Sequence, residues 1–152
     1  MVRARHGPPV SEPPGPGGAL LVVLQGEPTD EPLVELACTL ARAIGASLRA
    51  LWVIEVPRSR PLGEWDETAE RRARAALAAA AAIAQRRGCT LRSTVLPARD
   101  FGAAILDEAS EWAPRLVLLA FPAGGPRRAA VERVVAAAPP AVLLWRPPRA
   151  AE

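Results

Sequence analysis

The stretch AFPAGGPRRAAVERV, residues 120–134, contains the residue types that can hold a small anion. Gly124 and Gly125 stand where a helix is predicted to begin, and Arg127 and Arg128 lie in its first turn. Free backbone N–H groups at a helix N-terminus attract anions, and guanidinium groups add positive charge. The alternative is a tight turn followed by two solvated arginines. The sequence leaves both interpretations open.

Catalysis needs an acid, a base or a nucleophile that a second group activates. Gln25, Glu27, Glu55 and Ser59 lie at the ends of predicted strands, and no spacing gives any of them such a partner. Glu55 is either a loop carboxylate or a contact for a ribose. The single histidine is His6, so no histidine cluster can hold a metal ion. We therefore expect no catalytic residue, no metal site and no enzyme activity.

The two cysteines, Cys38 and Cys89, are far apart in the sequence and lack the spacing of a CxxC motif. We interpret them as small buried side chains of a protein in a reducing compartment. A disulfide or a metal ligand pair is not expected from them.

Charge and hydropathy exclude two classes of partner. The chain has 152 residues and no lysine, and its 19 arginines against 16 acidic residues give a net charge of +3. No segment has the dense positive charge that nucleic-acid binding needs. The apolar run ALLVVL is too short to cross a bilayer. We expect a cytoplasmic protein that contacts neither nucleic acid nor membrane.

The chain divides into a tail and one domain of alternating elements. Residues 1–18 are rich in proline and glycine, which predicts a disordered tail, with a docking arm as the alternative. Residues 19–147 form the predicted domain, and residues 148–152 a short second tail. Continuous apolar runs predict parallel strands, and apolar residues at helical spacing predict the helices between them. The expected strands are 19–24, 47–56, 89–97, 115–121 and 141–145, and the expected helices are 30–44, 65–87, 100–112 and 126–138.

Five strands alternating with four helices predict an α/β fold with a single open parallel sheet and helices on both faces. Thr29 or Asp30 is the expected N-cap of the first helix, and Asp100 that of the third. In an open parallel sheet of this kind, ligands bind at the carboxyl ends of the strands. The anion-site candidate at residues 120–134 lies at such an end.

Three segments resemble the universal stress protein family over residues 19–147. VERVVAAAPPAVLLW is similar to the closing segment of that family, ALWVIEV to its second strand, and PARDFGAAILDEA to the stretch after its third strand. The resemblance implies a Rossmann-like sheet with strand order 3-2-1-4-5 and a dimer. It also implies ATP or AMP binding at the carboxyl ends of the strands.

The motifs that bind ATP in the family are degenerate in this chain. The family aspartate after the first strand is replaced by Gln25, and only Gly26 keeps its identity in that turn. The glycine-rich loop after the fourth strand is about five residues shorter than the family spacing, and no serine or threonine follows Ser110. We therefore expect no cofactor, or weak ATP or AMP binding at most. The residues assigned to this vestigial nucleotide or anion site are Gln25, Gly26, Val53, Gly124, Gly125, Arg127 and Arg128.

Two functions follow as hypotheses. One is a homodimeric regulatory or stress-response protein that contacts an unknown protein partner and binds ATP weakly or not at all. The other is a sensor of nucleotide or phosphate that uses the loop after the fourth strand. The dimer is expected along the fifth strand, through Val142, Leu143, Leu144 and Trp145, because that edge carries no charge. Covering of this edge by the chain's own C-terminus is the alternative, and Leu143→Lys is expected to give a folded monomer.

Overall fold

The computed structural model describes residues 17–149 and confirms the predicted fold class. One parallel sheet has the strand order β3-β2-β1-β4-β5, with four helices between the strands. The elements, in chain order, are β1 (Ala19–Leu24), α1 (Asp30–Ile44), β2 (Ser47–Glu55), α2 (Glu67–Arg86), β3 (Leu91–Ala98), α3 (Phe101–Trp112), β4 (Leu116–Ala120), α4 (Pro126–Ala137) and β5 (Ala141–Trp145).

Burial follows each strand's place in the sheet. All six residues of β1 are buried, because β2 and β4 pair with it on either side and helices cover both faces. β3 has no fully buried residue and lies at one edge of the sheet, as its partly alternating sequence predicts. β5 lies at the other edge and pairs only with β4.

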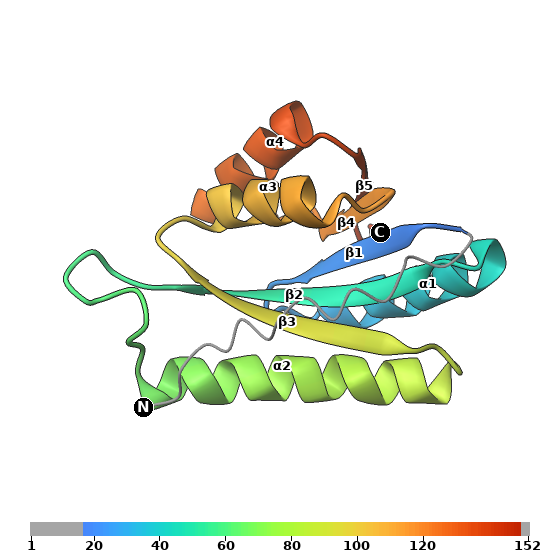
Figure 1. Cartoon of the computed structure of the whole chain (residues 1–152), viewed down its shortest axis with the longest axis horizontal. Helices are drawn as coiled ribbons and strands as arrows, with labels where there is room; N and C mark the ends of the chain where they lie inside the picture. Colours follow the sequence, from blue (N-terminus) through green and yellow to red (C-terminus); the bar gives the residue numbers. More distant parts are fainter. Residues whose placement is uncertain (1–16, 150–152) are drawn as a thin grey trace.

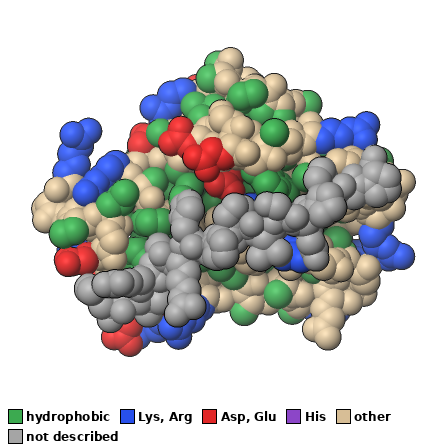
Figure 2. All heavy atoms as spheres, in the orientation of Figure 1, with side chains coloured by type: hydrophobic (Ala, Val, Ile, Leu, Met, Phe, Trp, Pro, Cys, Tyr) green, Lys and Arg blue, Asp and Glu red, His purple; other side chains and the backbone are tan. Residues whose placement is uncertain are grey.

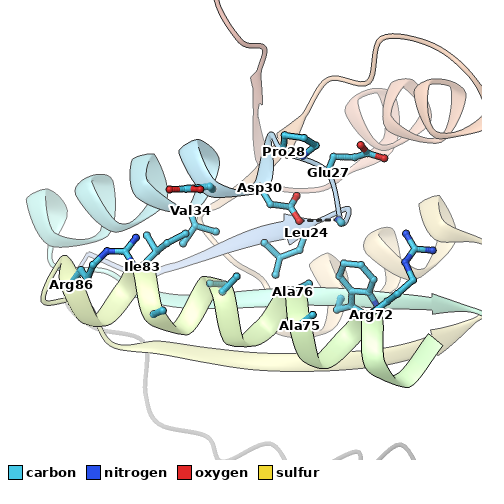
Figure 3. A pocket seen from close by; sticks show the side chains of 16 residues that line it. Leu24, Glu27, Pro28, Asp30, Val34, Arg72, Ala75, Ala76, Ile83 and Arg86 are labelled. Carbon is cyan, nitrogen blue, oxygen red and sulfur yellow. Dashed lines mark hydrogen bonds between the residues drawn. The ribbon is translucent and has the colours of Figure 1, made fainter. Parts of the chain in front are cut away.

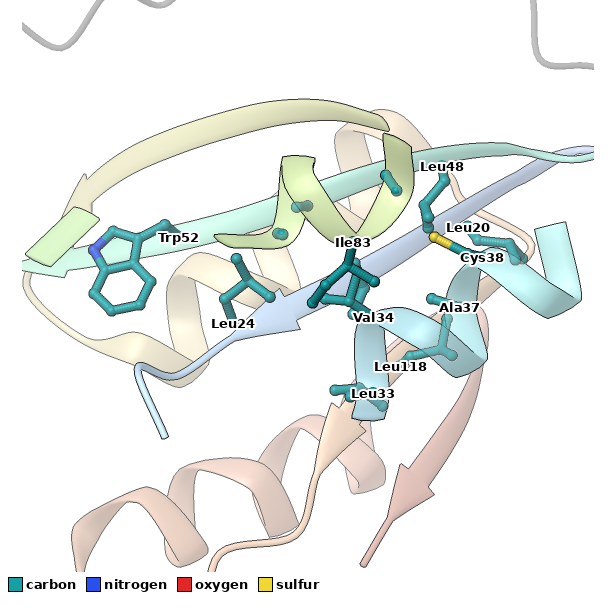
Figure 4. Packing of buried hydrophobic residues seen from close by; sticks show 14 of the residues in the cluster. Leu20, Leu24, Leu33, Val34, Ala37, Cys38, Leu48, Trp52, Ile83 and Leu118 are labelled. Atoms are coloured by element: carbon teal, nitrogen blue, oxygen red, sulfur yellow. The ribbon is translucent and has the colours of Figure 1, made fainter. Parts of the chain in front are cut away.

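The helices form one layer on each face of the sheet, with α3 and α4 on one face and α1 and α2 on the other (Figure 1). A larger apolar cluster joins β1 and β2 to α1 and α2 (Figure 4). A second cluster joins the opposite faces of the same strands to α3 and α4. The two clusters fix the directions in which strand residues point, and so decide which side chains reach either surface.

The starts of α1, α3 and α4 agree with the sequence prediction, and the start of α2 differs. Asp100 caps α3 as predicted, since its carboxylate accepts a hydrogen bond from the amide of Ala103. α2 begins at Glu67 rather than Trp65, because Asp66 is its N-cap. Thr29 is the N-cap residue of α1, but its side chain makes no capping bond. The Asp30 carboxylate points back toward the end of β1 instead.

Most of the predicted N-terminal tail, residues 1–16, lies outside the described residues. Gly17 and Gly18 are described, and both contact the domain: the Gly17 amide donates to the Gly45 carbonyl, and the Gly18 carbonyl accepts from the Ser47 amide. None of the helices in residues 17–149 has both the length and the apolar character of a membrane span. Arginine side chains stand at several separate places on the face that Figure 2 shows, not in one patch.

Candidate functional site

The carboxyl ends of β1, β2 and β4 carry most of the predicted site residues. Gln25 follows β1, and its side-chain amide nitrogen donates to the carbonyl of Ala120, the last residue of β4, at 2.9 Å. The Gln25 side chain is buried, so this bond joins the ends of the two central strands. The chain leaves β1 toward one face of the sheet and β4 toward the other, which is the place where open α/β sheets bind ligands.

The backbone amides at the end of β1 are occupied by the chain's own carboxylate. Asp30 accepts hydrogen bonds from the amides of Gln25 and Gly26, at 2.9 and 2.8 Å. Figure 3 shows the bond from Gly26 as a dashed line. Gly26 has φ 76°, and a Cβ there would lie 2.9 Å from the Trp52 ring, so the turn requires glycine. Burial raises the pKa of Asp30, and the two amide bonds oppose that shift.

Arg127, in the first turn of α4, is committed to groups within the protein. Its guanidinium lies 3.1 Å from the carboxylate of Glu55 at the end of β2 and 3.8 Å above the ring of Phe101. Burial lowers the pKa of Arg127, and Glu55 is the nearest compensating charge. The positive charge of Arg72 lowers the pKa of Arg127 further, whereas the negative charges of Glu27 and Asp30 raise it.

The glycine pair at the start of α4 is open to solvent. Gly125 is the N-cap residue of α4 with φ 78°, and no heavy atom lies within 4 Å of a Cβ built on Gly124 or Gly125. Arg128 pairs with Glu132 at 3.3 Å and lies 4.9 Å from the centre of the Phe121 ring. Of the predicted site residues, Gly124 and Gly125 are thus the ones with open space around them.

Val53 belongs to the buried core. It is 4% exposed and packs in the cluster beneath α3 and α4. Val53 therefore lies beneath the protein surface.

The structure brings five residues together at the strand ends, and we call this group the strand-end cluster. Its members are Gln25, Gly26, Asp30, Glu55 and Arg127.

A separate groove of about 530 Å³ runs between α1 and α2 (Figure 3). Alanine side chains of α2 form much of its wall, and Leu24, Val34 and Trp52 lie in its floor. Its rim carries charges of both signs, with Glu27 on the α1 side and Arg72 on the α2 side. Of the residues that the sequence assigns to the site, Gly26 alone lines it.

Residues 18–144 match the model of the universal stress protein family. The chain belongs to the universal stress protein family. No curated protein matches the chain.

Solved structures of universal stress proteins share the fold at low identity. A protein from Archaeoglobus fulgidus in complex with dAMP is 16% identical, with a TM-score of 0.70, over 84% of this chain and 96% of its own. One from Burkholderia pseudomallei is 21% identical, with a TM-score of 0.67, over 87% of this chain and 98% of its own. A third, in complex with cAMP, is 16% identical, with a TM-score of 0.64, over 84% of this chain and 94% of its own.

Two residues of this universal stress protein act differently from the sequence prediction. Asp30 was one of two candidates, with Thr29, for the N-cap of α1, and its carboxylate instead accepts hydrogen bonds from the amides that follow β1. Glu55 was left between two roles, and the structure pairs it with Arg127. The pairing of Glu55 with Arg127 has no local signal, because the two residues lie on elements that meet only when the sheet forms. An aspartate five residues after a strand-ending glutamine is the one feature that could have suggested the first contact.

Proposed function

We propose that this universal stress protein is a cytoplasmic, non-enzymatic regulator that acts through protein contacts as a homodimer and binds ATP weakly or not at all. The observation that carries the proposal is the Asp30 carboxylate on the amides of Gln25 and Gly26. Those amides would otherwise be free to bind a ligand at the strand ends. A phosphate there would have to displace a carboxylate and meet its negative charge.

The remaining positive charge of the strand-end cluster is already neutralised. The guanidinium of Arg127 forms an ion pair with the carboxylate of Glu55. The side-chain amide of Gln25 donates a hydrogen bond to the carbonyl of Ala120, so it is not free for a ligand either. No serine or threonine follows Ser110, so the loop after β4 offers no hydroxyl to a phosphate or to its magnesium ion. ATP binding would therefore break internal contacts and replace them with few new ones.

The dimer proposal is supported by the edge position of β5. Leu144 is 40% exposed on a strand with one hydrogen-bonded neighbour, so its outer N–H and C=O groups can pair with a second strand. A two-fold axis would bring two copies of β5 together antiparallel. Val142, Leu143, Leu144 and Trp145 are the proposed interface residues.

A second candidate function is sensing of a nucleotide or of phosphate by the loop between β4 and α4. The open glycine pair before α4 and the neighbouring Arg128 favour it. Two of the structurally similar universal stress proteins were solved with dAMP and cAMP. In this candidate the ligand would contact Gly124, Gly125 and Arg128, while Arg127 stays with Glu55.

Calorimetric titration with ATP and magnesium separates the two candidates. Each missing charge-assisted or hydroxyl contact weakens binding by about 1–3 kcal/mol, so we expect a dissociation constant near the millimolar range. A constant near one micromolar would contradict the main proposal. Thermal shifts with ATP, AMP and inorganic phosphate then test the sensor, because a specific ligand raises the unfolding midpoint.

A matched variant locates any binding that is found. Arg128→Ala should remove a shift caused by the β4–α4 loop, whereas Arg92→Ala, on the edge strand β3, should leave it unchanged. A shift that survives Arg128→Ala would place the ligand elsewhere and contradict the sensor candidate.

A further inference from the structure

The chain contains two cysteines, and the fold brings them together. Cys38 lies in the middle of α1 and is fully buried in the apolar cluster that α1 and α2 share. Cys89 lies between α2 and β3, is partly exposed, and packs against the same cluster. Both are free thiols, and Cys89 is a neighbour close enough to raise the pKa of the Cys38 thiol.

Three further contacts hold the turn with Cys89 in place, and two of them join it to α1. The Cys89 amide donates to the Ala84 carbonyl at 2.8 Å, which fixes the chain as it leaves α2. Arg42 of α1 donates to the carbonyl of Arg87 at 2.7 Å, and Arg87 pairs with Glu35 of α1 at 3.2 Å. Glu35 and Arg42 lie on either side of Cys38 in α1, so both contacts hold the turn that carries Cys89 against the stretch of α1 that carries Cys38.

The two thiols differ in their surroundings. Burial and the neighbouring Cys89 raise the pKa of Cys38 to about 12, so Cys38 stays protonated at neutral pH. Cys89 is the thiol that solvent reaches. A surface cavity of about 360 Å³ lies beside Cys38, and its lining includes Arg42 and Arg87. Because Cys38 is fully buried and Cys89 is partly exposed, an oxidant in solution would meet Cys89 first.

We propose that Cys38 and Cys89 form a dithiol site that a hydroperoxide oxidises to an intramolecular disulfide. The Cys89 sulfur attacks the peroxide oxygen, the O–O bond breaks, and a sulfenic acid and one water or alcohol molecule form. The Cys38 sulfur then attacks the Cys89 sulfur, the S–O bond breaks, and the departing hydroxide leaves as water with the Cys38 proton. Two electrons pass from the thiols to the peroxide, and an external dithiol reverses the reaction.

The neighbouring thiol decides the product. A sulfenic acid without a partner is oxidised further to the irreversible sulfinic acid. Here Cys38 lies in contact with Cys89, so disulfide formation competes with a second peroxide. The disulfide would join α1 to the start of β3, and it would raise the unfolding midpoint by restricting the unfolded chain.

The test is oxidation of the full chain with hydrogen peroxide, followed by alkylation of unreacted thiols in denaturant. We expect loss of both free thiols, a mass decrease of about 2 Da, a non-reduced peptide linking Cys38 to Cys89, and full reversal by dithiothreitol. A monomeric product on non-reducing electrophoresis is part of this expectation. In Cys38→Ser, the same treatment should add oxygen to Cys89 or couple two molecules through it.

Three results would overturn the proposal. Wild-type protein that gains oxygen at Cys89 while Cys38 stays free to be alkylated would show that the thiols do not couple. So would disulfides found only between molecules. A third contradicting result is peroxide treatment that modifies Cys89 in the Cys38→Ser variant but leaves both thiols of the wild type unchanged. The peptide map of the wild type decides the question even if a variant fails to fold.

Discussion

At the scale of single residues, Asp30 is the most informative side chain. Burial raises its pKa above the ordinary 3.8 of an aspartate, so the folded protein binds this proton more tightly than the unfolded chain does. Its contribution to stability is therefore fully present below the unfolded pKa and is lost as the pH rises through the folded pKa. Asp30→Asn removes this titration. We expect the unfolding free energy of wild type minus that of Asp30→Asn to fall as the pH rises from about 3 to 7.

Denaturant unfolding of both proteins at several pH values measures this difference. Asp107→Asn is the charge-matched control, since Asp107 is an exposed carboxylate on α3. The expectation would be contradicted if the unfolding free energy of wild type minus that of Asp30→Asn rose with pH. Such a rise would show that the two amide bonds outweigh desolvation and hold Asp30 ionised.

At the scale of elements, Asp100, the N-cap residue of α3, joins α3 to α4. The Asp100 carboxylate accepts from the amide of Ala103 and lies 2.5 Å from the guanidinium of Arg133 on α4. These contacts lower the pKa of Asp100, the capping bond most strongly. Asp100→Ala should lower the unfolding free energy by about 1 kcal/mol at neutral pH, nearly all of it from the lost cap.

Arg133→Ala separates the two contributions, because it removes the ion pair and leaves the cap. Both partners of that pair are about half exposed, so solvent screens the attraction, and the expected loss is a few tenths of a kcal/mol. Thermal or denaturant unfolding of both variants measures the difference. An Arg133→Ala loss as large as that of Asp100→Ala would show that helix–helix contact, not capping, is the larger effect.

At the scale of the whole molecule, the proposed dimer depends on one edge of the sheet. Leu143 and Trp145 pack against the α1–α2 cluster and Val142 against the α3–α4 cluster, whereas Leu144 belongs to neither and is exposed. A lysine at Leu143 would therefore disturb the core, and Leu144→Lys is the better test. We expect wild type to be dimeric at tens of micromolar and Leu144→Lys to be a folded monomer by light scattering.

Leu62→Lys is the matched control, since Leu62 is equally exposed, at 42%, in the loop after β2. It should leave the dimer intact. A monomeric wild type at this concentration, or a dimer that survives Leu144→Lys, would exclude pairing through β5.

The α/β class could be predicted from the sequence, because the signals for strands and helices are local and repeated. Continuous apolar runs such as ALLVVL mark strands that helices cover on both faces, and periodic apolar residues mark the helices between them. The structure confirms the resulting class and the strand order that the family resemblance implies. One element boundary was missed: α2 was expected to begin at Trp65 and begins at Glu67, because the Asp66 carboxylate caps the helix there.

Only the tertiary structure decided the pairings at the site. Glu55 with Arg127, Gln25 with Ala120, and Cys38 with Cys89 each join residues on different elements, and no spacing in the sequence predicts them. The cysteines were expected to be unrelated because they are distant in sequence. They meet because α1 and α2 pack on the same face of the sheet, which brings the turn after α2 against the middle of α1. Contacts of this kind depend on the positions of whole elements, and those positions are fixed only when both faces of the sheet are packed.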